Sequence, residues 1–284
     1  MISITSYDRP ETLEKALELL TSQEFRILAG GTDIIPQLRR GGSGKLLDIK
    51  RLGLDYIKSE GDYIEIGAAA THTDLTSNEI IEENLPILAT AAGLVGSTQI
   101  RNRGTVGGNI TNASPCADTA PALLIYDAEL LLKSISGDRQ VKLSDYIIEP
   151  YTTCKRPDEL LHSIKCRKAE SESGSSYIKL GRRQAVNISR MTLAATIRRD
   201  ENDTIQAARI SGGSVFPTPS RMPDVENMLI GEKVSSKLFE DAGKFAAELM
   251  IKVSGYRWSS PYKEPVLSGL LERALIRASA GGTK

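Results

Sequence analysis

Two segments of the sequence combine adjacent glycines with hydroxyl and carboxylate side chains. The first is ILAGGTDI, residues 27–34, and the second is RGTVGGNITNASPCAD, residues 103–118. Adjacent glycines let the main chain adopt positive φ and present several N–H groups to one anion, with no Cβ in the way. The hydroxyl groups can donate hydrogen bonds, whereas Asp33 and Asp118 accept them when ionised. This mixture fits a ligand that contains a pyrophosphate together with a polyol or a ring.

The residue types alone leave a second interpretation open, because a tight structural loop of buried turns also uses Gly, Asn, Asp and Ser. No G-x-G-x-x-G motif follows a strand, and Gly44 and Lys45 lack the flanking residues of a P-loop. Neither a Rossmann domain nor a P-loop NTPase is indicated. The sequence also shows no Ser/His/Asp or Cys/His arrangement, so we expect structural roles for His72 and His162.

Composition and charge exclude several classes of protein. The 284 residues include 36 Lys and Arg and 36 Asp and Glu, so no overall positive field favours nucleic acid. The three cysteines, Cys116, Cys154 and Cys166, form no C-x-x-C pair, and no metal site is expected. The N-terminus has no signal-peptide pattern, and no apolar run is long enough to span a membrane. We therefore expect a cytoplasmic protein that binds neither nucleic acid nor membrane.

Hydrophobic periodicity predicts the elements that must position the two glycine segments. Apolar residues at i, i+3, i+4 and i+7 indicate a helix with one buried face, and short apolar or alternating runs indicate strands. The first glycine segment follows a strand directly, and a helix rich in small residues leads into the second. The predicted elements of this part are helices over residues 13–20 and 85–96 and strands over residues 25–29, 46–49, 63–69, 123–132 and 160–166.

A polar segment, RKAESESGSS at residues 167–176, is the predicted domain boundary. The alternative is a long hairpin loop inside one domain. Strand-like runs and then two amphipathic helices follow, an order that predicts an α+β second domain with helices on one side of its sheet. The predicted elements here are strands over residues 176–180, 191–197 and 204–210 and helices around residues 238–249 and 266–275.

Six segments, taken in order, resemble one known family. They are GGTDIIPQLRRG, IGAAATHTDL, QIRNRGTVGGNITNASPCADTAPALL, YIKLGRRQAVNIS, GGSVFPTPSRMPDVENMLIG and WSSPYKEPVLSGLLERAL. Their order and spacing are similar to those of the FAD-binding (medium) subunit of the molybdenum hydroxylases, the xanthine dehydrogenase and carbon monoxide dehydrogenase flavoprotein family. The resemblance covers nearly the whole chain.

The resemblance implies an α+β fold of two domains. Residues 1–170 would form a vanillyl-alcohol-oxidase-type (PCMH) FAD-binding domain of two α/β lobes, and residues 176–284 a smaller domain of the CO dehydrogenase flavoprotein C-terminal type. The first glycine segment would wrap the FAD pyrophosphate, and the second would form the opposite wall. The FAD-binding residues implied in this way are Leu28, Ala29, Gly30, Gly31, Thr32, Asp33, Ile34, Val95, Gly96, Thr105, Gly108, Asn109, Ser114, Asp118, Leu161 and Lys179.

For four of these residues, the resemblance also implies which part of FAD they lie beside. Val95 and Gly96 correspond to residues beside the isoalloxazine, Leu161 to one near the adenine, and Lys179 to one close to the pyrimidine edge of the ring. A positive charge at Lys179 would stabilise negative charge on the reduced flavin.

The same resemblance implies electron transfer rather than substrate chemistry in this chain. A molybdopterin subunit would oxidise the substrate, expected to be xanthine or a related purine or N-heterocycle. Iron–sulfur clusters of the 2Fe–2S type in another subunit would carry single electrons to FAD, which would reduce a final acceptor such as NAD. No catalytic residue and no metal ligand are expected in the chain itself.

Two departures from the family pattern qualify these expectations. The cysteine-rich insertion that binds a 4Fe–4S cluster in some relatives is absent, and Asn187 stands where relatives often have an acidic residue, which puts NAD as acceptor in question. Two other functions are weighed: a free-standing FAD-dependent oxidoreductase of the same fold, and a flavin-less docking subunit. Arg101 and Arg103 have no assigned role beyond partner-facing or structural charges.

Overall fold

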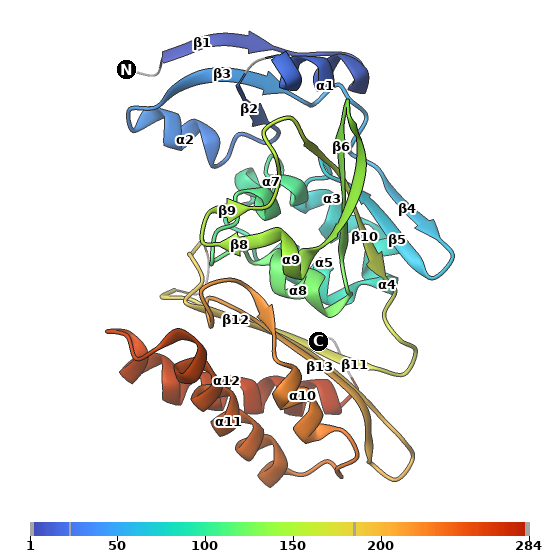
Figure 1. The fold of residues 1–284 in the computed structure, drawn as a ribbon. Helices are drawn as coiled ribbons and strands as arrows, with labels where there is room; N and C mark the ends of the chain where they lie inside the picture. Colours follow the sequence, from blue (N-terminus) through green and yellow to red (C-terminus); the bar gives the residue numbers. More distant parts are fainter. Residues whose placement is uncertain (1–2, 23, 184–185, 282–284) are drawn as a thin grey trace.

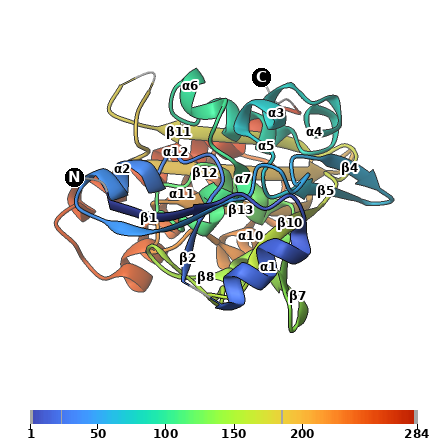
Figure 2. The same ribbon diagram turned by 90° about the horizontal axis from the view of Figure 1, so that it is seen from above.

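A computed structural model describes residues 3–22, 24–183 and 186–281 of the chain. The elements stack in chain order, with a small N-terminal lobe, a middle lobe and a C-terminal domain following one another along the molecule (Figure 1). Seen from above, the N-terminal lobe lies across the rest of the molecule (Figure 2). No helix of these described ranges is long and apolar enough to cross a membrane.

The N-terminal lobe is a three-stranded parallel sheet of order β1-β3-β2. The predicted helix packs on the sheet with its apolar face, and Ala16, Leu17 and Leu20 share a core with Leu47 and Ile49. Strand β1, with the sequence SITSYD, lacks an apolar run and was not predicted. The elements of this lobe are β1 (Ser3–Asp8), α1 (Leu13–Ser22), β2 (Phe25–Leu28), α2 (Ile34–Arg39) and β3 (Ser43–Asp48).

The middle lobe is a five-stranded antiparallel sheet of order β4-β5-β10-β6-β7, packed against short helices. Its core joins Ile64, Ile66 and Ile164 of the sheet to apolar residues of the helices. Its elements are β4 (Ile57–Glu60), β5 (Tyr63–Gly67), α3 (His72–Ser77), α4 (Glu79–Asn84), α5 (Pro86–Gly93), α6 (Thr98–Arg101), α7 (Val106–Thr111), α8 (Thr119–Ile125), β6 (Glu129–Ser134), β7 (Gly137–Lys142), α9 (Leu143–Tyr146), β8 (Ile147–Glu149), β9 (Thr152–Thr153) and β10 (Leu160–Arg167).

The predicted strand over residues 123–132 is wrong in its first half. Residues 123–125 end helix α8, and strand β6 begins only at Glu129. All seven residues of α8 are buried, so the helix shows no alternation of apolar and polar residues. An apolar run without periodicity does not distinguish a buried helix from a buried strand.

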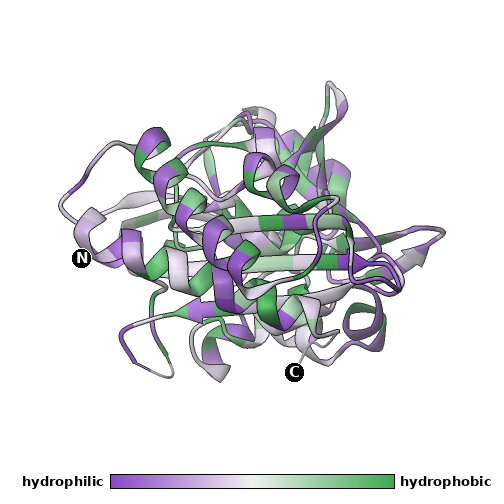
Figure 3. Ribbon diagram, turned by 90° about the horizontal axis from the view of Figure 1, so that it is seen from below, coloured by the Kyte–Doolittle hydropathy of each residue, from purple (hydrophilic) through white to green (hydrophobic). Residues whose placement is uncertain are grey.

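The C-terminal domain is a four-stranded antiparallel sheet of order β11-β12-β13-β14. Its helices cover one face, as predicted, and viewed from this side they carry both hydrophilic and hydrophobic residues (Figure 3). The opposite face is covered too, by α5 and α8 of the middle lobe. The elements are β11 (Gly174–Leu180), β12 (Met191–Arg199), β13 (Ile205–Gly213), β14 (Ser220–Arg221), α10 (Pro223–Leu229), α11 (Ser236–Ser254) and α12 (Ser260–Ser279).

Strand β12 shows how this sheet joins two cores. Leu193 and Ala195 pack with the C-terminal helices, whereas Ala194 between them belongs to the core of the middle lobe. Hydrogen bonds cross the same boundary, because the Ser211 hydroxyl donates to the Pro121 carbonyl at 2.6 Å and the Ser214 N–H to the Pro115 carbonyl at 3.0 Å. The two halves of the chain therefore share a boundary of apolar contacts and hydrogen bonds.

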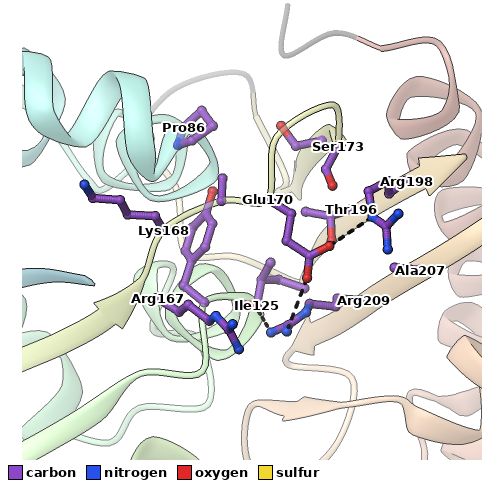
Figure 4. A pocket seen from close by; sticks show the side chains of 13 residues that line it. Pro86, Ile125, Arg167, Lys168, Glu170, Ser173, Thr196, Arg198, Ala207 and Arg209 are labelled. Carbon is purple, nitrogen blue, oxygen red and sulfur yellow. Dashed lines mark hydrogen bonds and ion pairs between the residues drawn. The ribbon is translucent and has the colours of Figure 1, made fainter. Parts of the chain in front are cut away.

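The segment between β10 and β11 lies over a small pocket at this boundary (Figure 4). Because β10 and β11 belong to different sheets, they do not form a hairpin. Glu170 of the segment points between Arg198 and Arg209, at 3.2 Å and 3.9 Å from their nearest guanidinium nitrogens, while Lys168 points away (Figure 4). The domain limits at residues 170 and 176 stay a prediction.

Candidate functional site

The two glycine segments meet at a groove of about 740 Å³, which is lined by both lobes and by part of the C-terminal domain. Among the residues implied by the resemblance, only Leu28 and Lys179 do not line this groove. Those that line it are Ala29, Gly30, Gly31, Thr32, Asp33, Ile34, Val95, Gly96, Thr105, Gly108, Asn109, Ser114, Asp118 and Leu161.

The first glycine segment forms a turn between β2 and α2. Gly31 has φ of +76°, a left-handed conformation that glycine adopts without strain. Within the described part of the chain, no acceptor takes the backbone N–H groups of residues 31–34, and Ile35 is the first to donate, to the Gly31 carbonyl at 3.2 Å. Successive free N–H groups in such a turn form an anion-binding site. Asp33 adds a carboxylate without a capping bond to α2, and burial raises its pKa.

The second glycine segment contains a short helix, α7, although its composition is typical of a loop. The N–H groups of its glycines and of Val106 are already bonded: Val106 donates to the Ala70 carbonyl at 2.9 Å, Gly107 to the Ala68 carbonyl at 3.0 Å and Gly108 to the Thr105 hydroxyl at 3.1 Å. This wall of the groove therefore offers side chains to a ligand, in contrast to the backbone groups of the first segment.

Close packing explains two of the glycines, one at the contact between the two segments and one against Ala68. A Cβ at Gly30 would lie 1.9 Å from the Arg103 carbonyl oxygen, and one at Gly107 would lie 2.6 Å from the Ala68 Cβ. The Arg103 Nε also donates to the Gly30 carbonyl at 3.4 Å, and Arg101 donates to the Val95 carbonyl at 3.1 Å. Of the two arginines left unassigned from sequence, Arg103 thus joins the two glycine segments, whereas Arg101 bonds within the segment around α6.

Asp118 and Lys179 form a buried ion pair across the domain boundary. The Lys179 Nζ lies 2.7 Å from the Asp118 carboxylate and 2.8 Å from the Leu94 carbonyl, and both side chains of the pair are less than a tenth exposed. The Ser189 hydroxyl donates to the same carboxylate. Burial raises the pKa of Asp118, while Lys179 and Ser189 act in the opposite direction. Asp118 therefore reaches the groove itself, and Lys179 lies behind it.

The groove also contains residues that sequence reasoning missed. Three are cationic, Arg26, Arg40 and Lys155. The sequence held no signal for them, because they come from a strand, a helix end and a loop that only the fold brings together. The other large or polar lining residues outside the two glycine segments and the implied FAD-binding set are Pro36, Gln37, Ile49, His72, Ile100, Tyr151, Leu160, Asn187 and Ile188.

The fold defines a two-domain protein, with a groove whose wall includes a turn of unpaired N–H groups. Residues 3–166 match the family model described as the FAD binding domain in molybdopterin dehydrogenase. Residues 176–278 match the model of the CO dehydrogenase flavoprotein C-terminal domain. The chain belongs to this family, the FAD-binding subunits of the molybdenum hydroxylases, which are components of oxidoreductase complexes.

Relatives span almost the same length. The chain is 33% identical to the glyceraldehyde dehydrogenase medium chain of Sulfolobus acidocaldarius, with 95% of this chain and 96% of the relative covered. It is 30% identical to the xanthine dehydrogenase FAD-binding subunit of Escherichia coli, with 99% of each covered. The structure of carbon monoxide dehydrogenase from Hydrogenophaga pseudoflava matches with a TM-score of 0.90 at 28% identity, with 100% of each chain covered.

Proposed function

We propose that this chain binds FAD in the groove and passes electrons from the iron–sulfur clusters of a partner subunit to a final acceptor such as NAD. The single observation that carries the proposal is the turn at residues 31–34, whose N–H groups have no acceptor in the described chain. These residues are half-buried or exposed at the groove, so a bound anion could take the place of water on their N–H groups. The pyrophosphate of FAD is such an anion, and the groove is of a size typical for a cofactor.

Different residues of the groove would contact different parts of FAD. The N–H groups of residues 31–34 would bind the pyrophosphate, aided by the positive charges of Arg26 and Arg40. Asp33 and Asp118 would accept hydrogen bonds from hydroxyl or ring N–H groups. Small and apolar wall residues such as Ala29, Val95, Gly96 and Leu161 would pack against the flat rings and exclude water. Bound FAD would supply an electron store that links one-electron carriers to a two-electron acceptor.

Two partner subunits complete the proposed complex, one with 2Fe–2S clusters and one with molybdopterin. The names of the relatives include glyceraldehyde, xanthine and carbon monoxide dehydrogenases, so chains of this kind occur in enzymes with different substrates. This diversity supports a division of labour in which the substrate binds to the molybdenum subunit. A purine or N-heterocycle remains the proposed substrate class, from the resemblance to xanthine dehydrogenase.

Purification of the chain and measurement of its absorbance test the proposal. We expect a flavin spectrum, release of FAD on denaturation, and co-purification with an iron–sulfur and a molybdopterin protein when the three are expressed together. A colourless chain that FAD does not reconstitute would instead indicate a docking subunit. A flavin-containing chain that oxidises substrate without partners would indicate a free-standing oxidoreductase.

A pair of glycine variants tests the turn itself. Gly31 and Gly53 both have positive φ, +76° and +64°, but only Gly31 lines the groove. Gly31→Ala and Gly53→Ala should both lower the stability by about 1 kcal/mol through backbone strain. Only Gly31→Ala should also weaken FAD binding, measured by quenching of FAD fluorescence. Equal FAD affinity in the two variants would argue against the turn as the pyrophosphate site.

A further inference from the structure

His72 is a buried polar side chain whose hydrogen-bonding capacity the protein does not use. It is 2% exposed, and its Nδ1 is buried without a partner. Within the described residues, no hydrogen bond is found for its other ring nitrogen either. An unsatisfied buried polar atom costs about 1–3 kcal/mol, and native proteins retain few of them. The Nε2 atom is not among the buried unpaired atoms, so it is the ring nitrogen open to the groove that His72 lines.

The fold places His72 at the junction of the two glycine segments. It begins α3, and its N–H donates to the Gly104 carbonyl at 3.0 Å. A Cβ built on Gly104 would lie 3.2 Å from the His72 Cδ2 and 3.4 Å from the Thr32 Oγ1. Only Gly104 therefore separates the imidazole from the turn at residues 31–34. The accessible ring nitrogen of His72 and the unpaired N–H groups of the turn therefore border the same groove.

The protonation state of His72 determines which hydrogen bonds it can make with a ligand. Burial, reinforced by the positive charge of Arg101, lowers the pKa of His72 to about 4. The imidazole is neutral at pH 7 and has one N–H donor and one acceptor nitrogen.

We propose that His72 is a cofactor-binding residue, whose ring N–H donates a hydrogen bond to an oxygen of FAD where the dinucleotide passes the first glycine turn. This inference rests on the proposed binding of FAD in the groove. It also reverses the structural role that the sequence predicted for this histidine.

His162 provides a matched control within the same chain. Its Nδ1 is likewise buried without a partner, and burial lowers its pKa. However, it lies on β10 beside the ring of Tyr56, at a centroid distance of 6.3 Å, and is not part of the groove lining. The two are the only histidines of the chain.

Replacing His72 by phenylalanine keeps an aromatic side chain at this position but removes both ring nitrogens. For His72→Phe we expect FAD to bind about 10-fold more weakly, the effect of losing one hydrogen bond to a charged or polar oxygen. The thermal midpoint of the FAD-free protein should not fall, because the nitrogen that is removed had no partner there. His162→Phe should leave FAD affinity unchanged, and His72→Gln, which retains an N–H donor, should recover part of the loss.

Equal FAD affinity of wild type and His72→Phe would overturn the inference while leaving the proposed function intact. A loss of FAD affinity accompanied by a lower midpoint of the FAD-free protein, and equally large in His162→Phe, would assign both histidines to structure alone. A wild-type chain that binds no FAD would overturn the proposed function together with the inference.

NMR of the wild-type chain labelled at histidine gives an independent test that needs no variant. With two histidines in the chain, two sets of ring signals are expected. Addition of FAD should shift the signals of His72 and leave those of His162 in place. Unshifted His72 signals in the FAD complex would exclude the hydrogen bond.

Discussion

At the scale of single residues, the charge of the groove wall depends on the pair formed by Asp118 and Lys179. The carboxylate lines the groove, and the ammonium group lies behind it at 2.7 Å. Lys179 therefore acts on a bound flavin mainly by neutralising Asp118, since it does not line the groove. Removal of the lysine would leave a negative charge beside the cofactor.

Lys179→Ala should lower the reduction potential of the bound flavin, because the uncompensated Asp118 disfavours additional negative charge on the ring. Breaking a buried pair from one side also costs about 3–5 kcal/mol of stability. Potentiometric titration and urea unfolding measure the two effects. The double variant Asp118→Asn/Lys179→Met should return both toward wild type, and an unchanged potential in Lys179→Ala would contradict the role of the pair.

His72 also makes the stability of the FAD-free protein sensitive to acid. Its pKa is about 4 when folded and near 6.5 when unfolded, so the unfolded chain binds the proton first as the pH falls. This contribution to stability is fully present above pH 6.5 and declines between pH 6.5 and 4, by on the order of 3 kcal/mol. Urea unfolding of wild type and His72→Phe at pH 7 and pH 4.5 checks this. A wild-type loss no larger than that of the variant would show that His72 does not contribute.

At the scale of elements, the groove depends on contact between the turn after β2 and the segment that follows α6. Gly30 permits this contact, because a Cβ there would lie 1.9 Å from the Arg103 carbonyl oxygen. Neither segment makes the groove alone, since one contributes backbone N–H groups and the other side chains.

Gly30→Ala should separate these two segments. We expect a loss of about 1–3 kcal/mol in stability, typical of overpacking, and strongly weakened FAD binding. Thermal unfolding and FAD titration measure both. Gly269→Ala is the matched control, because a Cβ at this position of α12 meets nothing within 4 Å and should be neutral or stabilising. Wild-type FAD affinity in Gly30→Ala would show that the contact is dispensable.

At the scale of the whole molecule, the FAD-binding domain and the C-terminal domain depend on each other. Helix α8 packs on β12 and β13, and Asp118, just before α8, receives Lys179 and Ser189 from the C-terminal half. The C-terminal domain thus covers apolar surface and neutralises a carboxylate of the groove. We infer that the two halves unfold together.

Expression of residues 1–170 alone tests this dependence. The fragment would expose the apolar surface of α8 and lose the cation beside Asp118, so we expect aggregation or loss of FAD. Calorimetry of the full chain should show a single transition. A soluble fragment that binds FAD as tightly as the full chain, or two separate transitions, would show that the domains are independent.

Particular elements show how far the sequence predicted the fold. Helix α1 and strands β5 and β10 appear where periodicity placed them, because each buries one face against a neighbour or lies inside a sheet. The prediction was wrong at residues 123–125, where a helix is buried on all sides and its pattern has no period. It missed β1, whose residues carry no apolar pattern, and the helical turns of the second glycine segment, where tertiary contacts override the low helix propensity of glycine.

The sequence by itself indicated the family, elements such as α1, β5 and β10, and the two segments that line the groove, because these depend on local residue types, periodicity and motifs. Only the tertiary structure decided which groups face a ligand. It placed Lys179 behind Asp118, brought Arg26 and Lys155 into the groove, and left the nitrogens of His72 without partners. Such properties depend on contacts between residues distant in sequence, and burial then determines which polar groups the protein satisfies itself.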